Sequence, residues 1–428
     1  MNVLVIGAGG REHAISWALA KGERSRLKLY CAPGNSGIAQ VAECVPIDSM
    51  DTSELARFTE EKGIHLTIVG GEAPLAAGIV DLFTNRGLAI SGASMAAARL
   101  ESSKAFAKDF MARHKIPTAR YRIATSAREA REILRSGEFG LDQAPVVIKA
   151  DGLAAGKGVV VARSHAEAER AVEDLMVGHG VGPGAASRIV IEEALEGPEA
   201  SMLLFADGRD YALMPVARDH KRVGENDTGP NTGGMGVITD QTVLDEETRR
   251  RVVREIVEPT LEGARAEGFE FRGVLFIGLM LTKEGPHALE YNVRLGDPEA
   301  QAILVRMRSD LLEVFEATTN GTLGQKRLEW SDDASACVVL ASRGYPVQPE
   351  SGAVILGLDR ARVHEQVEVF HAGTTRSASG QWLTAGGRVL GVTATGDSLT
   401  QALARCYDVV GEITWDGMHF RRDIGKQG

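Results

Sequence analysis

Short apolar runs alternate with helical patterns over the first hundred residues. Val3–Ile6 and Leu66–Val69 are apolar runs typical of buried strands, and a helical pattern covers His13–Lys21 between them. Strands that alternate with helices predict a parallel sheet with helices on both faces. We therefore expect an N-terminal doubly wound parallel sheet domain, of the α/β class, over residues 1–101.

A second unit is predicted over residues 102–326. Helix formers run from Ser103 to His114, and Pro117 then ends the helix. Two apolar strands, ending at Lys149 and beginning near Val159, are separated by a loop rich in glycine and alanine. We expect this loop to belong to a lid subdomain over about 123–191.

A hairpin is predicted near the end of the second unit. The apolar stretch Val274–Leu281 is followed by a turn at Glu284–Pro286 and a second strand over Ala288–Arg294. Because successive side chains on a strand point to opposite faces, Glu290, Asn292 and Arg294 should form one row. Their neighbours Leu289, Tyr291 and Val293 should face the other way.

The pattern changes once more after Leu328. Three apolar runs predict strands, and Ser398–Val410 has the period of an amphipathic helix. We expect a small C-terminal α+β domain over 327–428, whose work is packing and closing the site. The fold class is thus multidomain, α/β and α+β.

Composition narrows the possible functions. The 428 residues carry a net charge of -10, which argues against a nucleic-acid surface rich in Lys and Arg. No apolar run is long enough to cross a membrane, and no basic leader precedes Val3, so a cytoplasmic location is expected. Four scattered cysteines lack metal or disulfide spacing, which favours reduced structural thiols. The sequence leaves the oligomeric state open.

The predicted row on the hairpin has the chemistry of a metal and phosphate site. Glu290 and Asn292 offer hard oxygen ligands, and Arg294 offers a guanidinium that can bind phosphate or carboxylate. The turn that follows adds Asp297 and Glu299. The alternative is a solvated strand face, which would not usually end in two further carboxylates.

The first glycine turn, Gly7–Gly10, suggests a dinucleotide fold at first sight. That motif needs a third glycine where Glu12 stands, and no clear acidic residue follows the second strand. A glycine turn before a helix can still hold one phosphate on its backbone N–H groups. On this motif alone, a tight turn without a ligand fits equally well.

Three polar segments of the second unit are further candidates. The Gly/Ala loop Lys149–Val161 can fold over phosphate, although it lacks P-loop order and could be a plain hairpin. The acidic connector Glu192–Glu199 can offer groups to an adenine and a ribose, which is weak evidence alone. The polar loop Asp219–Gly236 is long enough to be functional, whereas His220 alone is more often structural.

Together these residues resemble the ATP-grasp ligases, and within them the branch that joins glycine to 5-phosphoribosylamine. The resemblance covers nearly the whole chain, and Gly71, where proline is expected, is a mild departure. Its motifs are Val5–Gly7 with Arg11–His13, Ala32–Asn35, Glu72–Leu75, Ser103–Phe106, Lys149–Gly158, His220–Arg222, Asp227–Gly236, Gly296–Glu299 and Gly386–Leu390.

The resemblance implies a central ATP-grasp fold and a site for ATP, glycine and 5-phosphoribosylamine. ATP would be a substrate, with Mg²⁺ or Mn²⁺ held by Glu290 and Asn292. Of the residues implied to be catalytic, Arg294 would steady a glycyl phosphate, with Lys221 and Asp297 nearby. The residues implied to bind ATP are Lys104, Lys149, Gly152, Gly156, Lys157, Gly158, Glu192, Glu193, Leu195 and Glu199. Those implied to bind phosphoribosylamine are Gly9, Gly10, Arg11, Pro33, Asn35 and Glu72.

Three rival hypotheses stay open on the sequence. Another ATP-grasp ligase of the purine pathway would share Lys149, Glu290 and Asn292 but should lack the Asp227–Gly236 run. A dehydrogenase is disfavoured by the missing third glycine. A non-catalytic nucleotide-binding regulator is disfavoured by the intact lysines and metal ligands.

Overall fold

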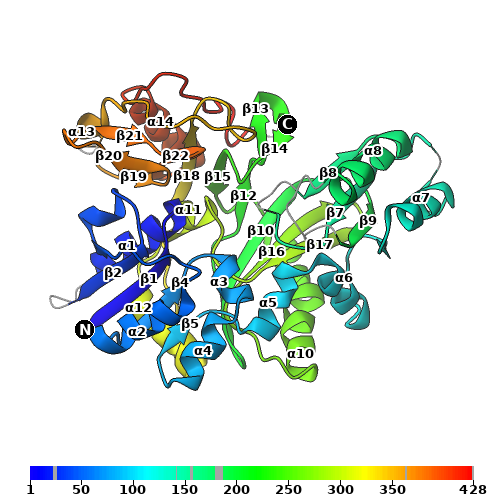
Figure 1. The fold of residues 1–428 in the computed structure, drawn as a ribbon, viewed down its shortest axis with the longest axis horizontal. Helices are drawn as coiled ribbons and strands as arrows, with labels where there is room; N and C mark the ends of the chain where they lie inside the picture. Colours follow the sequence, from blue (N-terminus) through cyan, green and yellow to red (C-terminus); the bar gives the residue numbers. More distant parts are fainter. Residues whose placement is uncertain (23–26, 141, 155–157, 179–186, 362–363, 427–428) are drawn as a thin grey trace.

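The computed structural model describes residues 1–22, 27–140, 142–154, 158–178, 187–361 and 364–426. Figure 1 shows the N-terminal sheet on the left, the C-terminal strands above it, and β7, β8 and β9 with α7 and α8 projecting on the right. None of the helices within these ranges is both long enough and apolar enough to cross a membrane.

The N-terminal part forms a parallel sheet in the order β3-β2-β1-β4-β5. Strand β1 pairs with β2 and β4 through residues that are almost fully buried, so each face needs a helical cover. The expected doubly wound parallel sheet is confirmed. Its elements are β1 (Asn2–Gly7), α1 (Gly10–Lys21), β2 (Lys28–Pro33), β3 (Glu43–Cys44), α2 (Thr52–Lys62), β4 (Leu66–Val69), α3 (Glu72–Ala76), α4 (Ile79–Asn85), β5 (Ile90–Ser91) and α5 (Met95–Ser102).

A small antiparallel sheet, in the order β6-β9-β7-β8, forms the projecting part of Figure 1. Its buried side chains form an apolar cluster of their own, drawn from residues between Ala124 and Ile191. Helix α6 (Lys104–Arg113) leads into it. The other elements are β6 (Tyr121–Ala124), α7 (Ala127–Arg135), β7 (Val146–Ala150), β8 (Val159–Ala162), α8 (His165–Met176) and β9 (Ile189–Glu193).

The largest sheet runs in the order β17-β16-β10-β12-β15-β18-β22-β19. Every neighbouring pair along it is antiparallel, and β18 continues from β15 without a gap in hydrogen bonding. One sheet therefore extends across residue 327. The strands before that point are β10 (Glu199–Asp207), β11 (Tyr211–Leu213), β12 (Ala217–Asp219), β13 (Arg222–Gly224), β14 (Thr228–Asn231), β15 (Gly236–Thr239), β16 (Arg272–Thr282) and β17 (Gly285–Asn292).

Helices pack against this sheet on both sides of residue 327. Those that precede it are α9 (Glu246–Val252), α10 (Glu258–Ala266), α11 (Glu299–Leu304) and α12 (Leu311–Asn320). The later elements are β18 (Ala334–Ala341), α13 (Leu358–Ala361), β19 (Val367–His371), β20 (Thr374–Arg376), β21 (Trp382–Thr384), β22 (Arg388–Gly396) and α14 (Leu399–Val410). The predicted helix over Ser398–Val410 is confirmed, with Ser398 as its N-cap.

The tail after Gly417 is fastened to the polar loop Asp219–Gly236. Arg421 is only 1% exposed, and its guanidinium donates to the carboxylate of Asp227 at 2.8 Å and to the carbonyl of Arg222 at 3.1 Å. Asp423 accepts from the Nε of Arg421 at 2.8 Å. A buried guanidinium without these partners would be costly, so the tail and the loop hold one another in place.

Replacing Arg421 by Met should lower the free energy of unfolding by about 3 kcal/mol, because the carboxylate of Asp423 loses its buried counter-charge. The neighbouring Arg422 has an exposed side chain and is the matched control, for which Arg422→Met should change stability by less than about 0.5 kcal/mol. Urea denaturation of both variants decides. Equal losses in the two would mean that the buried contacts of Arg421 contribute nothing specific.

Candidate active site

The end of β17 presents the predicted row of polar side chains. Tyr291 and Val293 are buried, whereas Glu290, Asn292 and Arg294 are partly exposed, so the predicted alternation holds from Glu290 onward. On the buried face of the strand, the hydroxyl of Tyr291 lies 2.7 Å from that of Thr260, and this hydrogen bond helps to fix the strand.

A register shift precedes this row. Opposite β16, Gly278 pairs with Glu290 but Leu279 pairs with Ala288, so Leu289 is an extra residue in the strand. Leu289 is consequently only partly buried, contrary to the prediction that it shares a face with Tyr291. The carbonyl of Leu289 instead accepts a hydrogen bond from the Nζ of Lys149 at 3.2 Å. The bulge therefore places a carbonyl of the strand that carries Glu290 against Lys149.

Arg294 is held by two carboxylates that come from the N-terminal helices. Its Nη2 lies 2.8 Å from Glu101 at the end of α5, and its Nε lies 3.2 Å from Glu72 at the start of α3. Nη2 also donates to the Oδ1 of Asn292 at 3.1 Å. Burial raises the pKa of Glu101 although Arg294 opposes the shift. Glu101 was not predicted, because nothing in its helical pattern distinguishes it from a surface residue.

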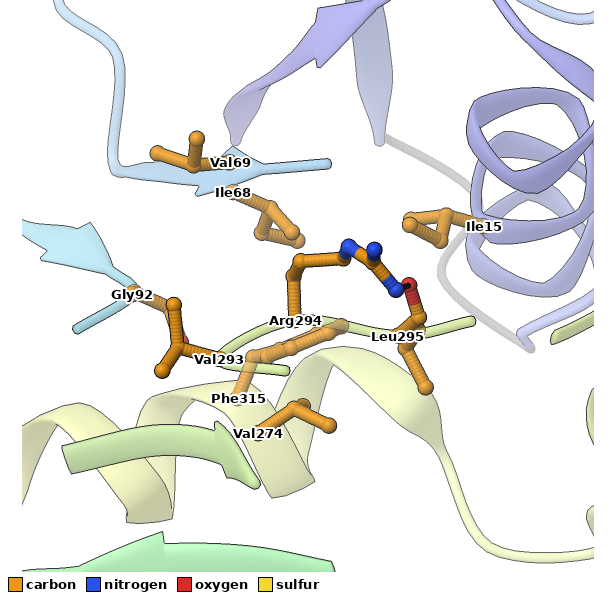
Figure 2. Close-up of a pocket in the computed structure, with 10 residues that line it drawn as sticks. Ile15, Ile68, Val69, Gly92, Val274, Val293, Arg294, Leu295 and Phe315 are labelled. Atoms are coloured by element: carbon orange, nitrogen blue, oxygen red, sulfur yellow. Dashed lines mark hydrogen bonds between the residues drawn. The ribbon is translucent and has the colours of Figure 1, made fainter. Parts of the chain in front are cut away.

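Figure 2 shows the side chain of Arg294 among apolar groups of several elements, including Ile15, Ile68 and Phe315. The cavity beside it measures about 10 Å³, which is room for about one water molecule. This cavity is therefore too small for a substrate, and it reflects the apolar packing beside the Arg294 side chain.

Glu290 lies among positive charges. Burial alone would raise its pKa, but Lys221, Lys149 and Lys104 outweigh burial and hold the pKa of Glu290 below its usual value. The Nζ of Lys221 lies 3.9 Å from Glu290 and 2.8 Å from Glu199. Glu290 is thus kept ionised. An ionised carboxylate beside an amide oxygen is a donor set that Mg²⁺ accepts, with phosphate and water completing the coordination.

Lys104 and the start of the Gly/Ala loop lie together. The Nζ of Lys104 donates to the carbonyl of Gly152 at 3.3 Å, and burial lowers the pKa of this lysine. The loop is anchored at Asp151, whose carboxylate accepts from Ser103 and from the guanidinium of Arg188. Gly158, at the far end, packs close to Ala154. Gly156 and Lys157, also predicted to bind ATP, lie outside the described residues.

The predicted adenine connector divides its side chains between two faces. Glu192 is buried and its Oε2 lies 3.0 Å from the Nζ of Lys149, whereas Glu193 points outward to Arg120 at 2.7 Å. Leu195 is partly buried. Glu199 faces Lys221 and so joins the charged cluster around Glu290.

A larger cavity, of about 510 Å³, opens between the N-terminal turn and the C-terminal strands. Gly9 and Asn35 line it, together with Asp297, as do Thr374 and Arg388 from the C-terminal part. Arg388 lies 3.3 Å from the carboxylate of Asp297, and this charge helps to hold the pKa of Asp297 down against burial. Among the described residues that line this cavity, Arg388 supplies the cation.

Several residues predicted to bind phosphoribosylamine have structural partners. The N–H of Gly9 donates to Glu12 at 2.7 Å, and the Nη1 of Arg11 donates to the carbonyl of Leu295 at 3.2 Å. The amide of Asn35 donates to the carbonyl of Ala8 at 2.7 Å. Gly10 packs against Gln301, while Glu72 is paired with Arg294 as described. Pro33 ends β2 just before the cavity. Of these residues, Gly9 and Asn35 line the cavity, and the polar groups of Gly9, Arg11 and Asn35 already have protein partners.

Arg388 was missed as a site residue by the sequence reasoning. The segment Gly386–Leu390 was noted as a motif, but only the pairing of β22 within the large sheet brings Arg388 to Asp297. A cation flanked by glycines at the start of a strand was the available signal.

Comparison with known proteins supports a single family. The models described as the N domain, the ATP-grasp (A) domain and the C domain of phosphoribosylglycinamide synthetase match residues 1–101, 102–300 and 335–427. Proteins named phosphoribosylamine–glycine ligase from Vibrio vulnificus strain YJ016 and from Pseudomonas aeruginosa are both 48% identical to this chain. The match covers 99% of this chain and 98% and 97% of theirs.

A solved structure of phosphoribosylamine–glycine ligase from Thermotoga maritima is also similar. Its TM-score is 0.84 at 34% identity, with 99% of this chain and 100% of that chain covered. The sequence relatives and the structural neighbour span the chain from end to end. The chain therefore belongs to the phosphoribosylglycinamide synthetase family of ATP-grasp ligases.

Proposed function

We propose that this protein is an ATP-dependent ligase that joins glycine to 5-phosphoribosylamine in de novo purine biosynthesis. The products are glycinamide ribonucleotide, ADP and phosphate. The observation that carries the proposal is the row Glu290, Asn292 and Arg294 on and just after β17, with Lys221, Lys149 and Lys104 near Glu290. Asp297, three residues after Arg294, lines the cavity of about 510 Å³. A metal, a polyphosphate and a second phosphorylated substrate can meet there.

ATP phosphorylates the carboxylate of glycine in the first half of the proposed reaction. Lys104 and Lys149 bind the phosphates, and the loop from Gly152 to Gly158 covers them. Glu192, Glu193 and Leu195 lie along the adenine, with Glu199 at the ribose. Support comes from the two lysines that meet Glu290 from separate elements, because fixed positive charges lower the barrier of phosphoryl transfer.

Glu290 and Asn292 hold the divalent cation, which is Mg²⁺ or Mn²⁺ in this proposal. The bound cation would neutralise phosphate charge during transfer. The lowered pKa of Glu290 and the oxygen of Asn292, fixed by Arg294 at 3.1 Å, fit this role. Mg²⁺ prefers several oxygen ligands, so phosphate oxygens and water would add to the two that Glu290 and Asn292 offer.

The amine of phosphoribosylamine attacks the glycyl phosphate in the second half. A carbon–nitrogen bond forms, the bond from carbon to the phosphate oxygen breaks, and the amine loses a proton. Arg294, Lys221 and Asp297 surround the reacting group. The cavity lined by Gly9 and Asn35 receives phosphoribosylamine. Gly10, Arg11, Pro33 and Glu72 complete the proposed binding region. Arg388 offers its phosphate a counter-charge.

We also propose the division of the chain and its location. Residues 1–101 bind phosphoribosylamine, residues 102–326 bind ATP with a lid at about 123–191, and residues 327–428 close the site. The separate apolar cluster of the lid supports that subdomain. The large sheet continues across residue 327, because β15 pairs with β18. The boundary at residue 327 therefore separates proposed roles and does not separate two sheets. A cytoplasmic location suits an enzyme of purine synthesis.

The function is tested by ADP release in the presence of Mg²⁺. ADP should form only when glycine and phosphoribosylamine are both present, and glycinamide ribonucleotide should form in equal amount. Release of ADP that is stimulated by a different amine or carboxylate, with no response to these two, would assign the chain to another ATP-grasp reaction.

Glu290→Gln and Asn292→Ala should each lower the rate of ADP formation by at least about a hundredfold, because losing one oxygen ligand weakens the cation that offsets phosphate charge. Glu284→Gln, at the exposed turn of the same hairpin, is the control and should keep the unaltered rate. Rates are measured against Mg²⁺ and Mn²⁺ concentration. Variants of Glu290 and Asn292 with unaltered metal dependence would contradict the assignment.

Arg388→Met should raise the concentration of phosphoribosylamine needed for half-maximal rate by about tenfold to a hundredfold, as expected for losing one charge-assisted hydrogen bond. ATP affinity should stay nearly constant. Arg376, which stacks on Trp382 in the same part of the chain, gives the control variant Arg376→Met. If the apparent affinities for ATP and for phosphoribosylamine fall equally and the melting temperature falls sharply, Arg388 has only a structural role.

A further inference from the structure

Lys108 lies in the middle of α6 and is only 2% exposed, which is unusual for a lysine. Its Nζ lies 3.0 Å from the Oε2 of Glu192 and donates to the hydroxyl of Thr118 at 2.7 Å. That hydroxyl donates in turn to the carbonyl of Ala288 at 2.6 Å. The ammonium is therefore fixed between the helix, β9 and β17.

The same carboxylate oxygen also serves Lys149. The Nζ of Lys149 lies 3.0 Å from the Oε2 of Glu192, so two ammonium groups share one oxygen atom. The side chain of Glu192 is 2% exposed, and no described residue donates to its other oxygen, Oε1. Glu192 thus has two ammonium partners, so Lys108 can stay paired with it if Lys149 moves away.

The binding of ATP phosphates should change how Glu192 is paired. Lys149 is the group that we assign to the phosphates, so its charge is drawn away from Glu192 when ATP binds. A carboxylate left without a counter-charge in this buried position is strongly disfavoured. A second ammonium on the same oxygen removes that penalty.

We propose that Lys108 is a positioning residue of the ATP site, which keeps Glu192 paired and in place while Lys149 turns to the phosphates. The inference rests on the proposed function, since it needs Lys149 to bind ATP. Lys108 itself does not touch the nucleotide in this account. It acts through Glu192, and its contribution is therefore larger in the ATP-bound protein than in the free one.

The contribution of Lys108 to ATP binding should depend on pH. Burial, with the positive charge of Lys149, lowers the pKa of Lys108 to about 8, although Glu192 and Glu290 oppose the shift. Phosphate offsets the charge of Lys149, so the pKa of Lys108 should rise when ATP binds. A group whose pKa rises on binding takes up protons, and its contribution is complete below about pH 8 and is lost as pH increases. Lys104, one turn earlier, also has a lowered pKa and could contribute.

The first test compares ATP affinity in Lys108→Met, in Glu192→Gln and in the double variant, by calorimetry at pH 7.5 with Mg²⁺ and without glycine. Lys108→Met should weaken ATP binding by about tenfold or more, since it strands a buried carboxylate. The double variant should bind ATP more tightly than Lys108→Met, because a neutral amide needs no counter-charge. Lys115→Met, an exposed lysine just beyond the same helix, is the control and should bind as the unaltered chain does.

The second test measures proton uptake on ATP binding at pH 8.5, from heats in two buffers with different ionisation enthalpies. The unaltered chain should take up protons, and Lys108→Met should take up fewer. Equal uptake in both, or a double variant that binds no better than Lys108→Met, would overturn the role of Lys108. If the unaltered chain binds no ATP at all, the ATP site itself is wrongly assigned, which is a separate result.

Discussion

The guanidinium of Arg294 is the contact that joins the N-terminal helices to the strand carrying the candidate metal ligands. It meets Glu101 at 2.8 Å, Glu72 at 3.2 Å and Asn292 at 3.1 Å. Glu101 also accepts from the backbone N–H of Val293 at 2.8 Å, so a buried carboxylate is committed to this one cation and its strand. Removing Arg294 would leave the buried Glu101 without its counter-charge, whereas removing Glu101 would leave Arg294 paired with Glu72 alone. The pairing thus ties α3 and α5 to the segment that follows β17.

Charge balance explains the rest of the site in the same terms. Glu290 is kept ionised by Lys221, Lys149 and Lys104, which come from three different segments of the chain. Glu192 takes the opposite role, as the carboxylate that holds Lys108 and Lys149 before a nucleotide is bound. Such fixed charges require little rearrangement when phosphate enters, which is how positioned groups lower the barrier of phosphoryl transfer.

Local patterns predicted much of this from sequence. The parallel N-terminal sheet follows from alternating apolar runs and helices, and the exposed row Glu290, Asn292 and Arg294 follows from the period of a strand. The bulge at Leu289 does not, because one extra residue depends on how β17 meets β16. The bulge places the carbonyl of Leu289 against Lys149. It also leaves the side chain of Leu289 only partly buried.

Other features needed tertiary structure. Glu101, Lys108 and Arg388 carry no local signal of their partners, since each meets a segment far away in sequence. The glycine turn was predicted to offer free N–H groups, yet the N–H of Gly9 is already bonded to Glu12. The roles given to Gly156 and Lys157 remain predictions, because these residues lie outside the described ranges.

The central claim is that the site works by placing charges around a glycyl phosphate, with the substrate amine as the attacking group. It is tested most directly with glycine labelled by ¹⁸O in its carboxylate. One labelled oxygen should appear in the inorganic phosphate for each glycinamide ribonucleotide formed, because the bond from carbon to the phosphate oxygen breaks in the second step. Phosphate that carries no label from glycine would show that no acyl phosphate forms and would contradict the account.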